Sequence, residues 1–568
     1  MRSTEDLLPP LVGLRDAVAG ARFELSGPGA AEASATRDAL VAQVDDYLLP
    51  RLRSLDAPLL AVVGGSTGAG KSTLVNSLVG SDVSTAGVLR PTTRSPVLVC
   101  HPSDRRWFED DRVLPGLART SGVEGGHGSV HLVESEGLQP GLALVDAPDI
   151  DSVVAANREL AAQLLAAADL WIFVTTAARY ADAVPWALLT AAAERSAAVA
   201  VVLDRTPPEA VEEVAADLRR MLVDHGLGDA LVRTIEESTL EGGRLPEPQV
   251  APLRAWLTAL ALDADARAEV VRATLEGALS SMERTVADLA VASREQERLA
   301  EALRAHVRDS YDDARGDVVA AMQDGTLLRG EVLARWQEFV GTGELMRSVQ
   351  AKVGALRDRA WATVTGRPTV ATGVQEAVES GVEAIVHAAA ARAAGRSLAA
   401  WRDGAAGRSL VQGRERDLGA ASPEVAGSLP DEVRAWQGQV LDLVREQGAG
   451  KRTSARIASY TLNGAGLAVM LAVFAHTGGL TGAEVAVAGG TSAASQKLIE
   501  AVFGDQAVRE LARQAREDLL VRVERLLSAD ARRFHDLVDA TAPRDGGQAL
   551  REAMTTWRDA RQAVGRAR

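Results

Sequence analysis

Short apolar runs alternate with helical stretches from residue 56 to about residue 252. This alternation is typical of a mostly parallel β-sheet with helices on both faces. The glycine-rich stretch 121–128 is predicted as a loop. The predicted strands are 59–63, 96–100, 129–133, 142–145, 170–174, 198–203 and 231–235.

The pattern changes after Pro252. No proline occurs between Pro252 and Pro368, or between Pro430 and Pro543, and apolar residues recur there at helical spacing among charged ones. Such stretches predict long amphipathic helices, most simply an antiparallel bundle. The chain before about residue 53 also has a helical apolar face, which a Gly-Pro-Gly break at 27–29 divides in two.

These patterns predict five segments. We expect a helical arm over 1–55 that packs on the trunk, an α/β domain over 56–252, an ascending helical trunk over 253–450, an apolar hairpin over 451–500, and returning helices over 501–568.

The stretch 457–496 is almost free of charge, with Glu484 as its one formal charge. Three alternatives remain open for it. It forms a hairpin that contacts or enters a membrane, it packs inside the trunk or a dimer, or its first half crosses the bilayer, for which roughly 20 residues are needed. Flanking basic residues suit an anionic membrane as a partner. They are Lys451, Arg452, Arg456 and Lys497.

Composition narrows the functional classes. A net charge of -15 argues against a nucleic-acid partner, because no overall positive field would attract phosphates. The single cysteine, Cys100, lies in an apolar run and predicts core packing, which suits a reducing compartment. The first residues are polar and acidic, without a signal-peptide core. We expect a cytoplasmic location, with peripheral attachment to the inner face of the cell membrane as one alternative.

A complete P-loop follows the first predicted strand of the α/β domain. The motif lies between a predicted strand and a predicted helix, which is the context in which a P-loop binds phosphate. The phosphate is bound by inward-facing backbone N–H groups and by the N-terminus of the helix. Lys71 is expected to reach the β- and γ-phosphates, and Ser72 to ligate Mg²⁺. The predicted nucleotide-binding residues of this loop and helix are Gly65, Ser66, Gly68, Ala69, Gly70, Lys71, Ser72 and Thr73.

Two further residues are expected to complete a Mg²⁺ site. Asp146 ends an apolar run, which places a carboxylate at a strand tip beside the P-loop. Thr93 lies in the loop 90–96, where its hydroxyl can bind Mg²⁺ and its N–H the γ-phosphate, so that hydrolysis would release the loop. The alternative for Asp146 is an aspartate in a turn that ends the strand, and the alternative for the loop with Thr93 is a proline-rich turn without a ligand.

These residues carry a family resemblance. The stretch from Lys71 to Gly80 resembles the helix after the P-loop in translation-factor-class GTPases, and Thr93-Arg94-Ser95-Pro96 looks like switch I of the dynamin superfamily. The helical arm and trunk resemble bacterial dynamin-like proteins, as do segments 327–331 and 336–339. The resemblance implies a P-loop G domain with a helical trunk, bound GTP and Mg²⁺, and assembly with itself or a paralogous partner. It makes Thr93 the switch I threonine and Asp146 the switch II aspartate.

The chain departs from that pattern at three places. Asp149 stands where a glycine normally contacts the γ-phosphate, and Gly68 stands where dynamins carry a serine that stabilises transition-state charge. Whether the adjacent Thr67 replaces that serine is open. The guanine-reading motif reads Asp204-Arg205-Thr206-Pro207. Arg205 would lie along the base, but Pro207 accepts no hydrogen bond from guanine, so Asp204 would have to supply the carboxylate.

The leading hypothesis is a Mg²⁺-dependent GTPase that drives self-assembly or rearrangement of the trunk on a membrane. The expected catalytic residues are Lys71, Thr93 and Thr67, without a general base, since this chemistry rests on positioning and electrostatics. Two alternatives stay open: a nucleotide-controlled scaffold with little or no hydrolysis, and a P-loop protein that uses ATP in place of GTP.

Overall fold

The computed structural model describes residues 4–85, 95–110, 112–120, 128–152, 154–194, 197–323, 370–449, 505–542, 545 and 547–566. The chain forms two compact units. Unit 1 comprises Met1–Phe23, Gly29–Glu295 and Asp545–Arg568, and unit 2 comprises Glu24–Pro28 and Gln296–Arg544.

Unit 1 contains a sheet whose described strands run in the order β3-β4-β2-β5-β1-β6-β7-β8. Every neighbouring pair is parallel except β2 with β5. The strands are β1 (Leu59–Gly65), β2 (Val97–Cys100), β3 (Ala118–Thr120), β4 (Ser129–Glu134), β5 (Leu142–Asp146), β6 (Leu170–Thr176), β7 (Ala198–Thr206) and β8 (Leu231–Glu236). The predicted mostly parallel sheet is confirmed, with the short edge strand β3 as an addition.

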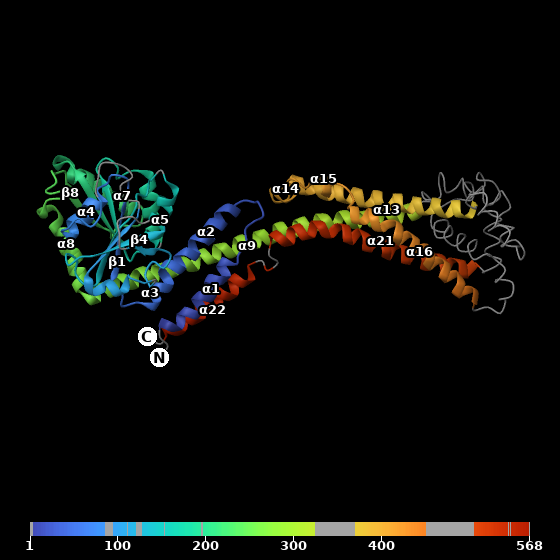
Figure 1. The fold of residues 1–568 in the computed structure, drawn as a ribbon, viewed down its shortest axis with the longest axis horizontal. Coiled ribbons are helices and arrows are strands. Elements are labelled where there is room, and N and C mark those ends of the chain that lie inside the picture. The colour runs from blue at the N-terminus through green and yellow to red at the C-terminus, as the bar shows by residue number, and fades with distance from the viewer. Residues whose placement is uncertain are drawn as a thin grey trace, which may run out of the picture. The chain divides into compact units, whose positions relative to one another are not determined.

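Both faces of the sheet are covered by helices (Figure 1). Alternate residues of β1 point to opposite faces, so Leu60 and Val62 enter one core and Ala61 the other. The first core includes α5 (Ala155–Ala166), α6 (Ala183–Glu194) and α7 (Val211–Asp224), and the second includes α4 (Lys71–Val79) and α8 (Glu247–Leu262). Cys100 is buried in the first core as predicted, and burial raises the pKa of its thiol to about 12.

Helices from both ends of the chain close a third core in unit 1. Leu11 and Leu14 of α1 are buried with Trp557 of α22 and Met282 of α9. The elements are η1 (Thr4–Leu7), α1 (Leu8–Ala19), α2 (Ala30–Gln43), η2 (Val44–Leu48), α3 (Leu49–Arg53), α9 (Ala264–Gln323) and α22 (Gln548–Gly565). Two short helices, η3 (Pro102–Trp107) and η4 (Pro208–Ala210), lie in loops of the sheet domain.

A buried ion pair joins the helical arm to the sheet. Arg51 of α3 donates to both carboxylate oxygens of Asp169, which directly precedes β6, and the Nε–Oδ1 distance is 2.9 Å. Its remaining N–H groups donate to the backbone carbonyls of Ser54, Ala57 and Pro58. All five guanidinium donors are therefore satisfied, as burial of this charge requires.

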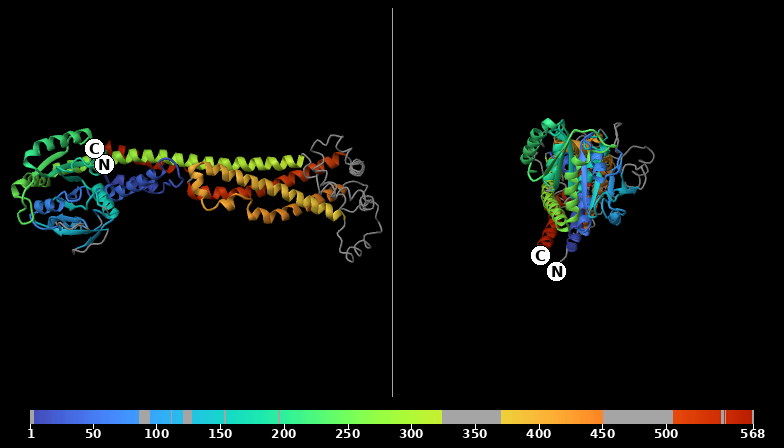
Figure 2. Two further views of the ribbon diagram at one scale, coloured as in Figure 1. Left: turned by 90° about the horizontal axis from the view of Figure 1, so that it is seen from above. Right: turned by 90° about the vertical axis from the view of Figure 1, so that its left-hand side faces the viewer.

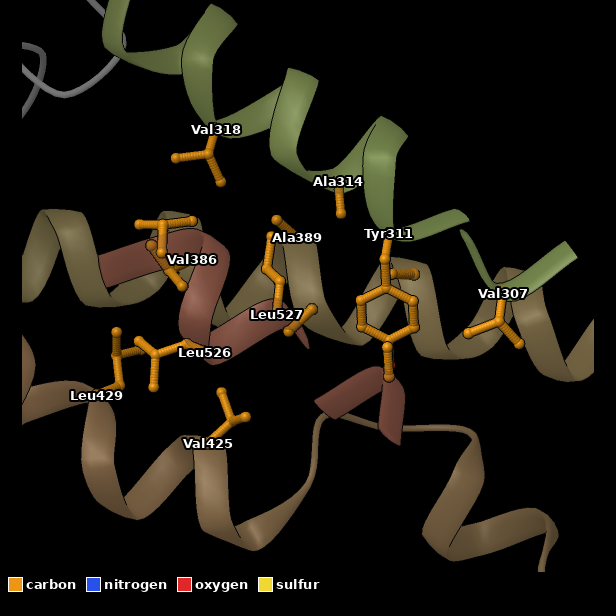
Figure 3. Close-up of a cluster of buried hydrophobic side chains, with 14 of the residues drawn as sticks. Val307, Tyr311, Ala314, Val318, Val386, Ala389, Val425, Leu429, Leu526 and Leu527 are labelled. Carbon is orange, nitrogen blue, oxygen red and sulfur yellow. The ribbon is translucent and has the colours of Figure 1, made fainter. Parts of the chain in front are cut away.

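Unit 2 is a bundle of long helices that lie side by side (Figure 2). Residues of α9 enter its core at spacings of three or four residues, the pattern of a helix with one buried stripe. Figure 3 shows Tyr311, Ala314 and Val318 of this stripe facing side chains of the neighbouring helices. Besides α9, the described residues of unit 2 form α13 (Val370–Asp403), α14 (Ala405–Val411), α15 (Glu415–Leu418), α16 (Pro423–Ala449) and α21 (Asp505–Thr541).

A phenol–carboxylate hydrogen bond lies inside this bundle. The Tyr311 hydroxyl donates to Asp530 Oδ2 over 2.7 Å, and burial raises the pKa of the phenol. We expect Tyr311→Phe to lower the free energy of unfolding of unit 2 by about 1–2 kcal/mol, because Asp530 keeps the N–H of Ser422 as a donor. Urea unfolding measures this. Tyr180→Phe, which breaks a similar hydrogen bond to Asp217 near the surface of unit 1, should lower the free energy of unfolding by less. An equal loss in the two variants would show that burial of the Tyr311 bond is not the cause.

Among the described residues, no helix is long and apolar enough to span a membrane. The segment 457–496 lies outside those residues, so its three alternatives remain predictions. The trunk segments 327–331 and 336–339 and most of the predicted loop 121–128 also lie outside them.

Candidate functional site

The P-loop joins the end of β1 to the start of α4, and β5 and β6 flank β1 in the sheet. Gly65, Gly68 and Gly70 have φ values of 153°, 75° and 96°. A Cβ at Gly70 would lie 2.3 Å from Asp204 Oδ2. Only glycine fits this path, which turns the loop tightly around the N-terminus of α4.

Lys71 is buried beneath the loop that it closes. Its Nζ donates to Gly65 O over 3.0 Å and to Ser66 O over 3.2 Å, and it forms an ion pair with Asp149. The position of the ammonium on the inside of the P-loop is the one from which a lysine reaches nucleotide phosphates.

Ser72 and Asp146 lie together at the carboxyl end of the sheet. Ser72 Oγ donates to Asp146 Oδ2 over 2.6 Å, and Ser84 Oγ donates to the same oxygen over 2.5 Å. Asp146 is fully buried, and burial raises the pKa of its carboxyl. Its Oδ1 has no hydrogen-bond partner among the described residues.

Thr67 is fixed by a carboxylate on the segment after β5. Asp151 Oδ1 accepts from Thr67 N over 2.6 Å and from Thr67 Oγ1 over 2.7 Å. Arg179, in the loop after β6, donates to Asp151 Oδ2 over 2.7 Å and to Thr67 O over 3.1 Å. These hydrogen bonds lower the pKa of Asp151 although partial burial opposes them.

Asp204 and Arg205 also lie against the P-loop. The Asp204 carboxylate is buried beside Gly70, and burial raises its pKa. Arg205 has a φ of 50°, rare for a residue with a side chain, and its guanidinium donates to Gly68 O. The structure therefore brings both candidate base-reading residues to the loop. Pro207 follows directly after β7.

The arrangement fits a nucleotide with Mg²⁺. Mg²⁺ prefers oxygen ligands, and the Ser72 hydroxyl and the unpartnered Asp146 Oδ1 offer two on one side of the P-loop. The buried Ser66 hydroxyl has no hydrogen-bond partner in the described part of the chain either. Unpartnered buried polar atoms are costly, and bound phosphate or metal would satisfy them.

Three residues of this site were not predicted from the sequence. Ser84, Asp151 and Arg179 carried no recognised motif, although Asp151 and Arg179 both follow the carboxyl end of a strand near the P-loop, where ligands bind in parallel sheets. Thr93 lies outside the described residues, so its role stays a prediction.

No protein-family model matches the sequence, and no curated protein matches it. Among solved structures, an oligomerised bacterial dynamin pair, described as a mechanism for the long-range sensing and tethering of membranes, is 11% identical over 96% of each chain, with a TM-score of 0.41. Toc33 from Arabidopsis thaliana in complex with Mg²⁺ and GMPPNP is 17% identical over 41% of this chain and 94% of its own chain, with a TM-score of 0.25. Toc33 in complex with GDP and Mg²⁺ is 18% identical over 40% of this chain and 92% of its own chain, with a TM-score of 0.24.

At these identities and TM-scores, none of the matches bears on the activity of this chain. The chain's own sheet order, glycine loop and long helices define its fold class. In fold the chain combines a P-loop α/β domain, of the G-domain class, with a long helical trunk.

Proposed function

We propose that the chain binds a nucleoside triphosphate, GTP in preference to ATP, together with Mg²⁺, and hydrolyses it. One observation carries the proposal: Lys71, Ser72 and Asp146 converge around a glycine loop at the carboxyl end of a parallel sheet. Lysine, hydroxyl and strand-end carboxylate are the groups that bind phosphate and Mg²⁺ in P-loop proteins. The choice of guanine rests on the family resemblance.

Each site residue has a proposed role. Lys71 binds the β- and γ-phosphates and, with Thr67 and Thr93, stabilises charge as the terminal phosphoryl group is transferred to water. Ser72, Thr93 and Asp146 would hold Mg²⁺, which would neutralise charge on the phosphate oxygens. Asp204 and Arg205 contact the base. The nucleotide cradle is the loop of Gly65, Ser66, Gly68, Ala69 and Gly70 with the N-terminal residues of α4, Lys71 to Thr73.

The helices would convert nucleotide state into assembly. Loss of the γ-phosphate would release the segment that carries Thr93, and the trunk would rearrange or assemble with a second copy or a paralogous partner. A membrane partner, peripheral attachment at the inner face of the cell membrane and the five predicted segments belong to the same proposal.

Nucleotide affinity tests the site. We expect wild type to bind GTP more tightly than ATP in the presence of Mg²⁺, and Lys71→Ala to lose affinity by about a hundredfold or more, because a buried charged partner of the phosphates is removed. Isothermal titration calorimetry measures both. The control is Arg220→Ala, which removes an exposed cation on α7. Unchanged nucleotide affinity in Lys71→Ala would show that the site is assigned to the wrong residues.

A nucleotide-controlled scaffold is the second candidate, because in this structure Asp149 is already paired with Lys71. Turnover of GTP at high protein concentration, with and without anionic phospholipid vesicles, separates the two. Bound nucleotide without hydrolysis under both conditions would select the scaffold, and preferred binding of ATP would overturn the assignment of guanine.

A further inference from the structure

The segment after β5 places carboxylates on phosphate-binding groups of the P-loop. Asp149 pairs with the ammonium of Lys71, and Asp151 accepts from the backbone N–H of Thr67. Lysine and P-loop backbone N–H groups are what a nucleotide's phosphates bind in such loops. Two oxygen anions of the chain itself therefore occupy donors that phosphate oxygens would use.

Lys71 has no donor to spare in this arrangement. An ammonium has three N–H groups, and those of Lys71 face Gly65 O, Ser66 O and Asp149 Oδ1. Two of these acceptors are backbone carbonyls fixed by the loop. A phosphate that binds Lys71 must displace the Asp149 carboxylate or lie beside it, and two anions so close repel each other.

Asp149 is the exchangeable carboxylate of the two. Its side chain is 28% exposed, and among the described residues its carboxylate pairs with Lys71 alone. Asp151 is 16% exposed and is held by Thr67 and by Arg179 together. Displacing Asp149 thus costs one ion pair, whereas displacing Asp151 would break a network.

We propose that Asp149 is a specificity-determining residue: its carboxylate competes with the terminal phosphate for Lys71 and shifts the preference of the site from the nucleoside triphosphate toward the diphosphate. The inference rests on the proposed nucleotide function. A triphosphate carries more charge and extends one phosphoryl group further, so its repulsion by Asp149 is stronger than that of a diphosphate. The glycine of the related family pattern has no such charge.

The test compares two ligands on the full chain. Calorimetry with Mg²⁺ gives the affinities of GMPPNP and GDP for wild type, Asp149→Asn and Asp149→Gly. We expect Asp149→Asn to bind GMPPNP about tenfold more tightly than wild type does, and GDP by a clearly smaller factor. Asp149→Gly should change the ratio in the same direction. Asp110→Asn, which removes an exposed carboxylate elsewhere on unit 1, should leave the ratio unchanged.

The outcomes separate the inference from the function beneath it. Nucleotide binding that depends on Lys71, with the same GMPPNP to GDP ratio in wild type and both Asp149 variants, would overturn the inference and leave the function standing. An equal gain for both ligands would also overturn it, since the carboxylate would then not discriminate. Failure of wild type and Asp149→Asn to bind either nucleotide would overturn the function and the inference together.

Discussion

Replacing Arg51 with methionine is expected to lower the free energy of unfolding of unit 1 by about 3–5 kcal/mol, because it leaves the carboxylate of Asp169 buried without its counter-charge. The Asp169 side chain is only 1% exposed. The N–H of Leu60 still donates to it over 2.8 Å, but a neutral donor does not offset a full buried charge. Urea unfolding of the full chain measures the loss, and hydrogen exchange at the Leu60 amide locates it in β1.

A second variant tests the cause. In Arg51→Met with Asp169→Asn the buried charge is gone, while the amide oxygen still accepts from Leu60 N. The double variant should therefore recover a large part of the lost free energy. Arg220→Met, which breaks an exposed ion pair with Asp217, should change stability much less. A double variant as unstable as the single one would show that packing of Arg51, and not its charge, stabilises the arm.

Gly65→Ala is expected to cost about 3 kcal/mol or more in unfolding free energy and to abolish nucleotide binding. A Cβ at Gly65 would lie 2.1 Å from the backbone oxygen of Val174 in β6, so the two strands would have to separate. Separation would also displace Gly65 O, to which Lys71 donates. Thermal unfolding and calorimetry with GTP measure the two effects.

The neighbouring glycine is a matched control. A Cβ at Gly64 would meet Leu165 Cδ2 at 3.1 Å, the end of a side chain that can rotate. We expect Gly64→Ala to change stability by about 1 kcal/mol or less and to keep nucleotide affinity. Equal damage from the two substitutions would mean that β1 tolerates no added volume at all, and that the path of the P-loop is not the reason.

The sequence predicted the sheet well because buried parallel strands are largely apolar runs. All seven predicted strands are present, and five of them are continuous apolar runs, whereas 129–133 and 231–235 include polar residues. The edge strand β3 was missed, since Ala118-Arg119-Thr120 has no apolar pattern that would mark it as a strand, although it pairs with β4. Periodicity likewise predicted one buried stripe along α9.

The site was predictable only in part. Lys71, Ser72 and Asp146 follow from a motif and a strand end, and parallel strands bring those to one edge of the sheet. The pairing of Asp149 with Lys71 depends on how one loop lies over another, which no local pattern encodes. The same holds for Arg205, whose left-handed backbone turns its guanidinium to Gly68 O.

The core shared by α1 and α22 bears on how the chain is made. Leu11 and Trp557 belong to the first and last helices, so this core has a very high contact order. At roughly 5–20 residues per second, the ribosome would need roughly half a minute to two minutes to reach α22 after α1 has emerged. The part of the apolar face of α1 that packs on α22 stays uncovered during that time, which gives chaperones or a second nascent chain an opportunity to bind it.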